Sequence, residues 1–265
     1  MIKLACATVS TDGFDQNNFN TTFEALPKVG IKFIEFNCWI PDNFSEKSIK
    51  NMKQRCSNTG LTPLSIYSGD FFGDEQFSKR LMDAALELGC QRIVSDSAER
   101  GEGGGLEKII SRLESVIPEL EKNDLTICLE NHYKSNLELP EDYQRIFDAI
   151  PSENVGLCLD TGHFHASGVD MIDLIEKMKD RINHVHLKDN IELGTIKFLN
   201  FGEGSIDFDA ILNKLIDSGY SGYLVFEISP EIYDIDYMAG ETFADYFDIE
   251  NLFNAKKMFE KYERP

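Results

Sequence analysis

Four short apolar segments of the sequence each carry, at or near their end, a residue that can bind a metal ion. These residues are Glu130 in LTICLE, Asp160 in NVGLCLD, His186 in RINHVHL and Glu227 in YLVFE. If the segments are β-strands, they recur at intervals close to one βαβ step, which takes roughly 30 residues or more. We therefore expect the four side chains to meet at one shared site.

The chemistry of this set favours a cation. One of these residues alone would more often cap a helix or form a salt bridge, but three converging carboxylates repel one another unless a positive charge neutralises them. Oxygen-rich ligands suit Mn²⁺, Mg²⁺ or Co²⁺, and the histidine also tolerates Zn²⁺. We expect a divalent metal ion, with two open positions for neighbouring oxygens of a sugar or polyol.

The elements that must position these residues alternate between strand and helix along the whole chain. Strands are predicted at 2–9, 31–37, 61–67, 91–96, 125–130, 154–160, 181–187 and 222–228, and helices at 17–28, 45–58, 75–88, 106–122, 140–150, 169–179, 208–217 and 241–262. This alternation predicts a closed parallel (β/α)8 barrel, a TIM barrel. A chain of 265 residues with 42% hydrophobic content suits a single domain covering 1–265.

Side-chain alternation along the strands supports this arrangement. With Glu130 directed into the barrel, Cys128 also faces inward and Leu129 faces the helices, because successive residues of a strand point to opposite sides. With Asp160 directed inward, Cys158 follows it. The metal-binding candidates then lie at the carboxyl ends of their strands, where barrel enzymes build active sites.

Composition excludes several classes of partner. The net charge of −20 opposes binding to nucleic acid, which depends on Lys and Arg contacts to phosphates. No run of about 18 apolar residues indicates a membrane span, and the N-terminal apolar run is too short for a secretory signal. Six dispersed cysteines without a C-x-x-C pair indicate reduced thiols. We expect a cytoplasmic protein, and a homo-oligomer is compatible with the sequence.

The same segments form an ordered series that resembles a known family. They are LENH at 129–132, LDTGH at 159–163, HVHLKDN at 184–190, the FGEGSID turn at 201–207 and GYSGYLVFE at 219–227. The series is similar to the xylose-isomerase-like barrels, the sugar phosphate isomerase/epimerase superfamily that includes ketose 3-epimerases, inosose dehydratases and endonuclease IV. The resemblance runs from about the fourth strand to the eighth.

The resemblance implies roles for individual residues. The implied metal ligands are Glu130, Asp160, His186 and Glu227. In the ketose 3-epimerase branch the two ligand glutamates also transfer the proton, which would make Glu130 and Glu227 catalytic, and His163 would hold a substrate hydroxyl. The inward strand phase adds His132 and Lys188 as candidate substrate contacts at the rim of the pocket.

Two departures from the family narrow the prediction. The three-zinc nuclease branch needs further His and Asp ligands, but Tyr67, Ser68, Ser95, Asp96 and Phe198 stand near those places. The arginine that grips the substrate in 3-epimerases is also missing, and only Lys197 lies nearby. We predict a metal-dependent isomerase or epimerase that abstracts a proton next to a carbonyl. An inosose-dehydratase-like lyase is the main alternative, ahead of a non-catalytic sugar-binding or metal-binding barrel and a nuclease.

Four further polar residues receive weaker interpretations. Glu35 and Asp96 lie near the ends of the second and fourth strands, and each is expected either to contact substrate or to be a solvated carboxylate at the rim. His184 keeps the inward phase of His186 one layer deeper and is expected to be structural. His165 is expected to lie in a loop.

Overall fold

The computed structural model describes residues 1–13, 18–69, 71–228 and 247–264. Its main strands are β1 (Lys3–Ala7), β2 (Phe33–Asn37), β3 (Thr62–Tyr67), β4 (Arg92–Ser95), β5 (Thr126–Glu130), β6 (Val155–Asp160), β7 (Ile182–Leu187) and β10 (Tyr223–Phe226). All are parallel and close into a barrel in the order β1, β10, β7, β6, β5, β4, β3, β2. The predicted single TIM-barrel domain is confirmed.

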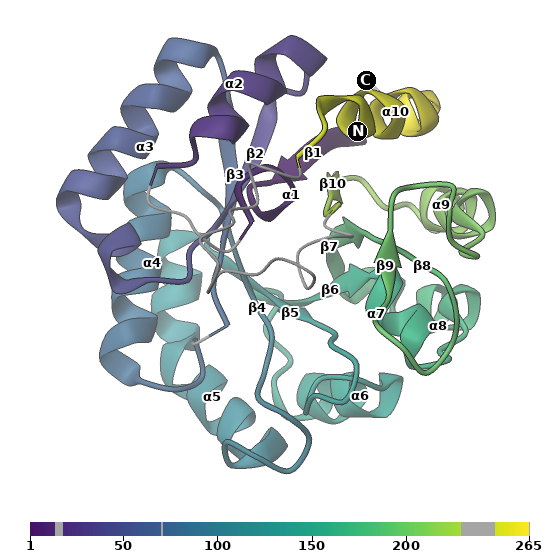
Figure 1. The fold of residues 1–265 in the computed structure, drawn as a ribbon. Helices are drawn as coiled ribbons and strands as arrows, with labels where there is room; N and C mark the ends of the chain where they lie inside the picture. Colours follow the sequence, from purple (N-terminus) through teal and green to yellow (C-terminus); the bar gives the residue numbers. More distant parts are fainter. Residues whose placement is uncertain (14–17, 70, 229–246, 265) are drawn as a thin grey trace, which may run out of the picture.

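Helices surround the barrel (Figure 1). The principal ones are α2 (Asn20–Val29), α3 (Glu46–Thr59), α4 (Glu75–Leu88), α5 (Gly105–Asn123), α6 (Pro140–Ala149), α8 (Met171–Met178), α9 (Phe208–Asp217) and α10 (Ile249–Phe259). Several begin after an aspartate whose carboxylate accepts backbone N–H groups of the first turn, as Asp74 does for α4 and Asp170 for α8. No helix among the described residues is long and apolar enough to cross a membrane.

The barrel wall separates a large outer core from smaller clusters. Leu129 belongs to the large outer core that packs the strands against the helices. Cys128 and Cys158 belong instead to a small inner cluster with Tyr67 and Val94. The predicted inward and outward phases of β5 and β6 are therefore confirmed. All six cysteines are free and buried, as expected for structural thiols.

Several elements differ from the prediction. β1 ends at Ala7 and is followed by the short helix α1 (Val9–Asp12). A second short helix, α7 (Thr161–Ala166), follows β6 directly, because the Asp160 carboxylate caps it by accepting the backbone N–H of His163 at 2.8 Å. The expectation that His165 lies in a loop is wrong, since it lies in α7.

The starting residue of the last predicted helix also needs correction. The last helix, α10, begins at Ile249 after its cap Asp248, whereas the prediction began at 241. Residues 241–246 of that prediction lie outside the described residues, as does residue 17 of the first predicted helix.

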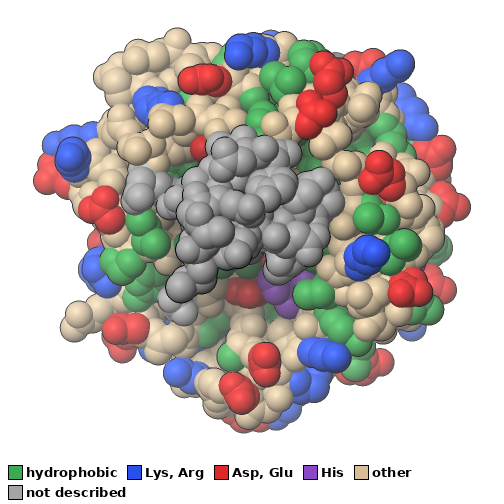
Figure 2. All heavy atoms as spheres, in the orientation of Figure 1, with side chains coloured by type: hydrophobic (Ala, Val, Ile, Leu, Met, Phe, Trp, Pro, Cys, Tyr) green, Lys and Arg blue, Asp and Glu red, His purple; other side chains and the backbone are tan. Residues whose placement is uncertain are grey.

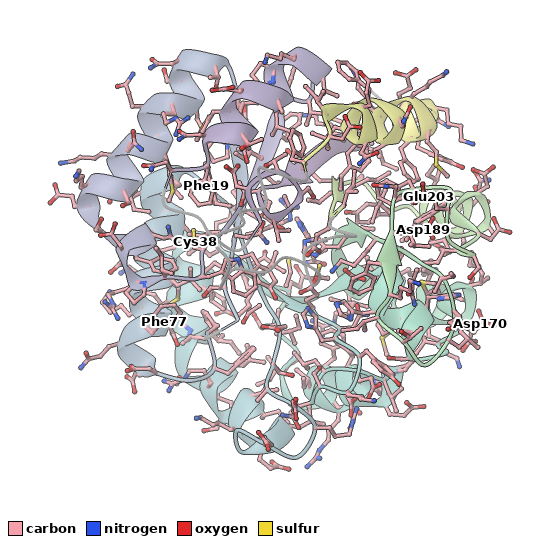
Figure 3. All side chains as sticks on the ribbon, in the orientation of Figure 1. Phe19, Cys38, Phe77, Asp170, Asp189 and Glu203 are labelled. Carbon is pink, nitrogen blue, oxygen red and sulfur yellow. The ribbon has the colours of Figure 1, made fainter. Side chains whose placement is uncertain are left out.

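An unpredicted hairpin follows β7. Its strands β8 (Asp189–Asn190) and β9 (Phe198–Leu199) pair antiparallel. The Asp189 Oδ2 atom accepts the backbone N–H groups of Gly202 and Gly204 at 2.9 and 3.1 Å, so this buried carboxylate anchors the FGEGSID turn. Figure 3 shows Asp189 and, in the turn, Glu203 on this side of the barrel.

Candidate metal centre

The four predicted ligands come together at the carboxyl ends of their strands. Glu130 ends β5, Asp160 ends β6, His186 is the penultimate residue of β7, and Glu227 directly follows β10. One ligand atom from each residue lies within 4.8 Å of the corresponding atoms of the others. Glu130, Asp160 and His186 are almost fully buried, and the Glu227 side chain is 13% exposed. On the face seen in Figure 2, acidic and histidine side chains lie near the centre.

Ion pairs bind the cluster together. His186 Nδ1 lies 2.5 Å from Glu130 Oε1 and 3.0 Å from Glu227 Oε2. The Lys188 ammonium lies 3.2 Å from Asp160 Oδ2 and 3.1 Å from Glu227 Oε1. Lys188 is 4% exposed, so it is buried in the cluster and does not lie at an exposed rim as predicted. One imidazole and one ammonium therefore offset the charge of three buried carboxylates.

The arrangement fits a divalent metal ion. Within the described part of the chain, Asp160 Oδ2 and Glu227 Oε2 are buried oxygens that face cationic groups, Lys188 at 3.2 Å and His186 at 3.0 Å, without a well-aligned hydrogen bond. Ligand atoms about 2.0–2.2 Å from an ion lie at most about 4 Å apart, close to the spread of these four atoms. A carboxylate-rich set with one imidazole supports a divalent cation without selecting one metal.

The charge states of the carboxylates suit this purpose. Burial alone would raise the pKa of Glu130, but His132 and His186 hold it well below its usual range. Burial would also raise the pKa of Glu227, but Lys188 and His186 lower it below its usual value. At Asp160 burial prevails over the attraction of Lys188 and raises the pKa to about 6. Near neutral pH all three groups are anions, the form that binds metal.

Two stacked histidines line the cluster. The ring centroids of His132 and His163 are 4.0 Å apart, with 16° between the planes. His132 Nε2 lies 2.7 Å from Glu130 Oε2 and its Nδ1 lies 3.3 Å from Asp96 Oδ2. His163 Nδ1 accepts the backbone N–H of Tyr133 at 3.2 Å. Burial lowers the pKa of His163 well below its usual range, so the neutral ring carries its proton on Nε2 as a donor.

The interpretation of Glu35 as a solvated carboxylate at the rim is wrong. Glu35 is fully buried inside the barrel, with Oε2 accepting from Ser65 Oγ at 2.7 Å and lying 2.9 Å from His184 Nε2. Its Oε1 lies 3.0 Å from His186 Nε2. The sequence does indicate this depth. β2 ends at Asn37, and Glu35 lies two residues earlier, so its side chain points to the same side of the strand as that of Asn37 but one layer deeper in the barrel.

The sequence of this chain is similar to those of known barrel proteins. The model of the xylose isomerase-like TIM barrel family matches residues 23–242. The chain belongs to this family. It is 26% identical over 219 residues to the inosose dehydratase of Geobacillus thermodenitrificans, covering 68% of this chain and 74% of that protein. It is 31% identical to the inosose dehydratase of Salmonella typhimurium, but over 119 residues, 39% of this chain and 40% of that one.

Two solved structures share the fold across the whole chain. The IOLI protein with a binding zinc atom superposes with a TM-score of 0.74 at 22% identity, covering 99% of this chain and 100% of that chain. L-ribulose 3-epimerase superposes with a TM-score of 0.71 at 20% identity, covering 100% and 99%. The predicted membership of the xylose isomerase-like family is confirmed.

Asn131 holds the backbone of the candidate ligand Asp160 in place, a role that the sequence did not predict. Its Oδ1 accepts the backbone N–H of Asp160 at 2.8 Å, and its Nδ2 donates to the Asp160 carbonyl at 3.0 Å. Two hydrogen bonds from one side chain therefore join the ends of β5 and β6. An asparagine after a strand gives no sequence signal of such a bridge, because asparagine is also common in turns.

A pocket of about 350 Å³ lies beside the centre, at the carboxyl ends of β3 and β4. Its lining includes Trp39, Ser68, Asp96, Ser97, Lys108 and Asn136. Asp96 connects the pocket to the cluster through its contact with His132. The pocket therefore reaches the cluster through two side chains, Asp96 and His132, the second of which contacts Glu130.

Proposed function

We propose that this protein is a divalent-metal-dependent enzyme that removes a proton from the carbon next to a carbonyl group of a small sugar or polyol. The observation that carries the proposal is the convergence of Glu130, Asp160, His186 and Glu227 on one buried point. Glu130 ends β5 and Glu227 directly follows β10, so we expect the two carboxylates to approach the substrate from different sides. The curated relatives named inosose dehydratase and the structural neighbour named L-ribulose 3-epimerase support this class of substrate.

The chain's own residues supply the proton chemistry. When bound, the ion would polarise the substrate carbonyl and stabilise the negative charge that develops on its oxygen. Glu227 is the base, because its side chain is 13% exposed and that of Glu130 only 1%, so Glu227 is the more accessible carboxylate. Glu130 receives a proton from His132 through their 2.7 Å contact and delivers it to the opposite face of the carbon, which inverts the carbon, while the proton on Glu227 passes to water. His163 donates its Nε2 proton to a substrate oxygen.

A lyase of the inosose-dehydratase kind is the second candidate, because the curated relatives cited above carry that name. Its first step is the same proton transfer to a carboxylate. The carbon–oxygen bond of a β-hydroxyl group then breaks, and the hydroxyl leaves as water after accepting a proton. The buried Lys188 ammonium, which contacts both Asp160 and Glu227, is placed to donate that proton.

Turnover in D₂O tests the proposal and separates the two reactions. The protein loaded with Mn²⁺, Co²⁺, Mg²⁺ or Zn²⁺ would be incubated with ketoses and inososes and followed by NMR. Deuterium at one carbon beside the carbonyl of a ketose supports epimerisation, and an unsaturated or deoxy product supports dehydration. The Asp160→Asn variant is the control and should be inactive in both. If no metal-loaded sample exchanges any proton beside a carbonyl, the proposed function is wrong.

A further inference from the structure

Glu35 is a buried carboxylate near the candidate ligands that has no role in the proposed proton transfer. Glu35, on β2, is separated from the substrate side of the centre by the ring of His186. Its two oxygens have different partners: Oε2 receives Ser65 and His184, whereas Oε1 faces His186. Glu35 Oε1 and His186 Nε2 have no other hydrogen-bond partner among the described residues.

We propose that Glu35 is a positioning residue of the metal centre, which fixes the ring of His186 so that Nδ1 faces the ion; the inference rests on the ligand set of the proposed function. An imidazole ligand presents the lone pair of one nitrogen and carries a proton on the other. Nδ1 faces Glu130 and Glu227, and Nε2 faces Glu35. An acceptor at Nε2 therefore selects the tautomer with Nδ1 free for metal.

The surroundings of Glu35 keep it in place for this purpose. Ser65 Oγ and His184 Nε2 both direct a proton at Oε2, which orients the carboxylate and leaves Oε1 for His186. Glu35, His184 and His186 are all 0% exposed, so water does not substitute for either contact. A carboxylate at the remote nitrogen also increases the basicity of a histidine ligand, and loss of such a partner typically weakens metal binding about 10–100-fold.

A second ion in the barrel interior is the rival interpretation. Cys158, His184 and His186 also place one ligand atom each within 4.8 Å of one another. His186 Nε2 lies 3.0 Å from Glu35 Oε1 and its Nδ1 faces Glu130 and Glu227, so neither ring nitrogen is left for an ion at Cys158 and His184. If Glu35 orients His186 instead, the chain holds one ion and not two.

Metal binding by matched variants tests the inference. Mn²⁺ affinity and stoichiometry would be measured by titration calorimetry for the wild type, Glu35→Gln and Ser65→Ala, after thermal unfolding confirms that each is folded. We expect one ion per chain in the wild type and an affinity about 10–100-fold weaker in Glu35→Gln. Ser65→Ala keeps the contact of Oε1 with His186, so its affinity should change much less.

A second readout does not depend on the variants. In ¹⁵N-labelled wild-type protein loaded with diamagnetic Zn²⁺, NMR should show the His186 proton on Nε2. A proton on Nδ1, two ions per chain, or wild-type affinity in Glu35→Gln would each overturn the role of Glu35. Failure of the wild type to bind any Mn²⁺ or Zn²⁺ would instead overturn the proposed function itself.

Discussion

The two glutamates of the centre are the same residue type in different surroundings. Glu130 has both carboxylate oxygens in contact with histidines, Oε1 with His186 and Oε2 with His132. Glu227 contacts Lys188 and His186, and its side chain is the more exposed of the two. This asymmetry assigns Glu227 to the first proton transfer and Glu130 to the delivery of a proton to the opposite face within the proposed mechanism.

Replacement of Glu227 by glutamine should abolish most turnover. The substitution removes a base and a candidate metal ligand together, so kcat should fall by more than the ~10²–10⁴ typical of one acid–base group. Turnover and bound Mn²⁺ should be measured on the same samples. Glu203→Gln, an exposed residue outside the cluster, is the matched control and should leave both unchanged. Near wild-type turnover in Glu227→Gln would contradict the proton-transfer role.

The metal-free protein should lose stability in mildly alkaline solution because of His132. Burial lowers its affinity for a proton, but Glu130 and Asp96 prevail and raise the pKa of His132 to about 9. A histidine stabilised in its charged form contributes stability below pH ~6.5, and this stability is lost as the pH rises through 9. Urea unfolding in EDTA should show a loss of about 3 kcal/mol over that window. In His132→Gln the free energy of unfolding should depend much less on pH. An equally steep pH dependence in that variant would mean that another group causes it.

The sequence reveals part of this residue pattern and conceals the rest. Strand phase and spacing predicted where Glu130, Asp160 and His186 converge, because each ends or nearly ends an apolar strand. Glu35 was misplaced because its depth depends on where β2 ends within the barrel register, next to Ser65 of β3. Asn131 was missed because a bridge between two strand ends exists only in the folded chain.

At the scale of elements, long apolar runs were predictable and side-chain-dependent turns were not. The eight barrel strands follow from runs that are buried on both faces. The short elements α7 and β8–β9 have too few residues for a periodic pattern. They depend on individual carboxylates, Asp160 at the start of α7 and Asp189 within the FGEGSID turn.

The turn around Asp189 should be sensitive to a single methyl group. A Cβ at Gly204 would collide with the Asp189 carboxylate and lie 2.6 Å from the Asn190 carbonyl oxygen. Gly204→Ala should therefore destabilise the protein by about 1–3 kcal/mol, as overpacking does. Gly219→Ala is the comparison, since that position has a φ of +90° but no atom within 4 Å of a Cβ. It should cost about 1–2 kcal/mol through strain of the left-handed backbone alone. Urea unfolding checks both, and the collision predicts the larger loss for Gly204→Ala, so a smaller loss there would contradict it.

At the scale of the whole molecule, the charge of −20 sets the long-range electrostatics. The protein should not bind or cleave abasic DNA duplex at physiological salt, because it lacks the cationic excess that displaces counterions from phosphates. Fluorescence anisotropy of a labelled duplex, with Mn²⁺ or Zn²⁺ present, measures binding, and a gel assay measures cleavage. Metal-dependent cleavage that Asp160→Asn abolishes would assign the centre to a nuclease.

The metal should also stabilise the barrel as a whole. The candidate ligands span residues 130–227 and come from β5, β6, β7 and β10, which are neighbours in the barrel wall. An ion that binds them binds the folded state alone, because an unfolded chain does not hold four such groups together. At a free metal concentration about 100 times Kd, this contributes about 2.7 kcal/mol. For a chain of this size, that corresponds to a Tm increase of roughly 5–10 °C. Calorimetry with Mn²⁺ and with EDTA should show this difference in the wild type and lose it in His186→Ala. Equal Tm values for the metal-loaded and chelated wild type would mean that these strands are not joined through an ion.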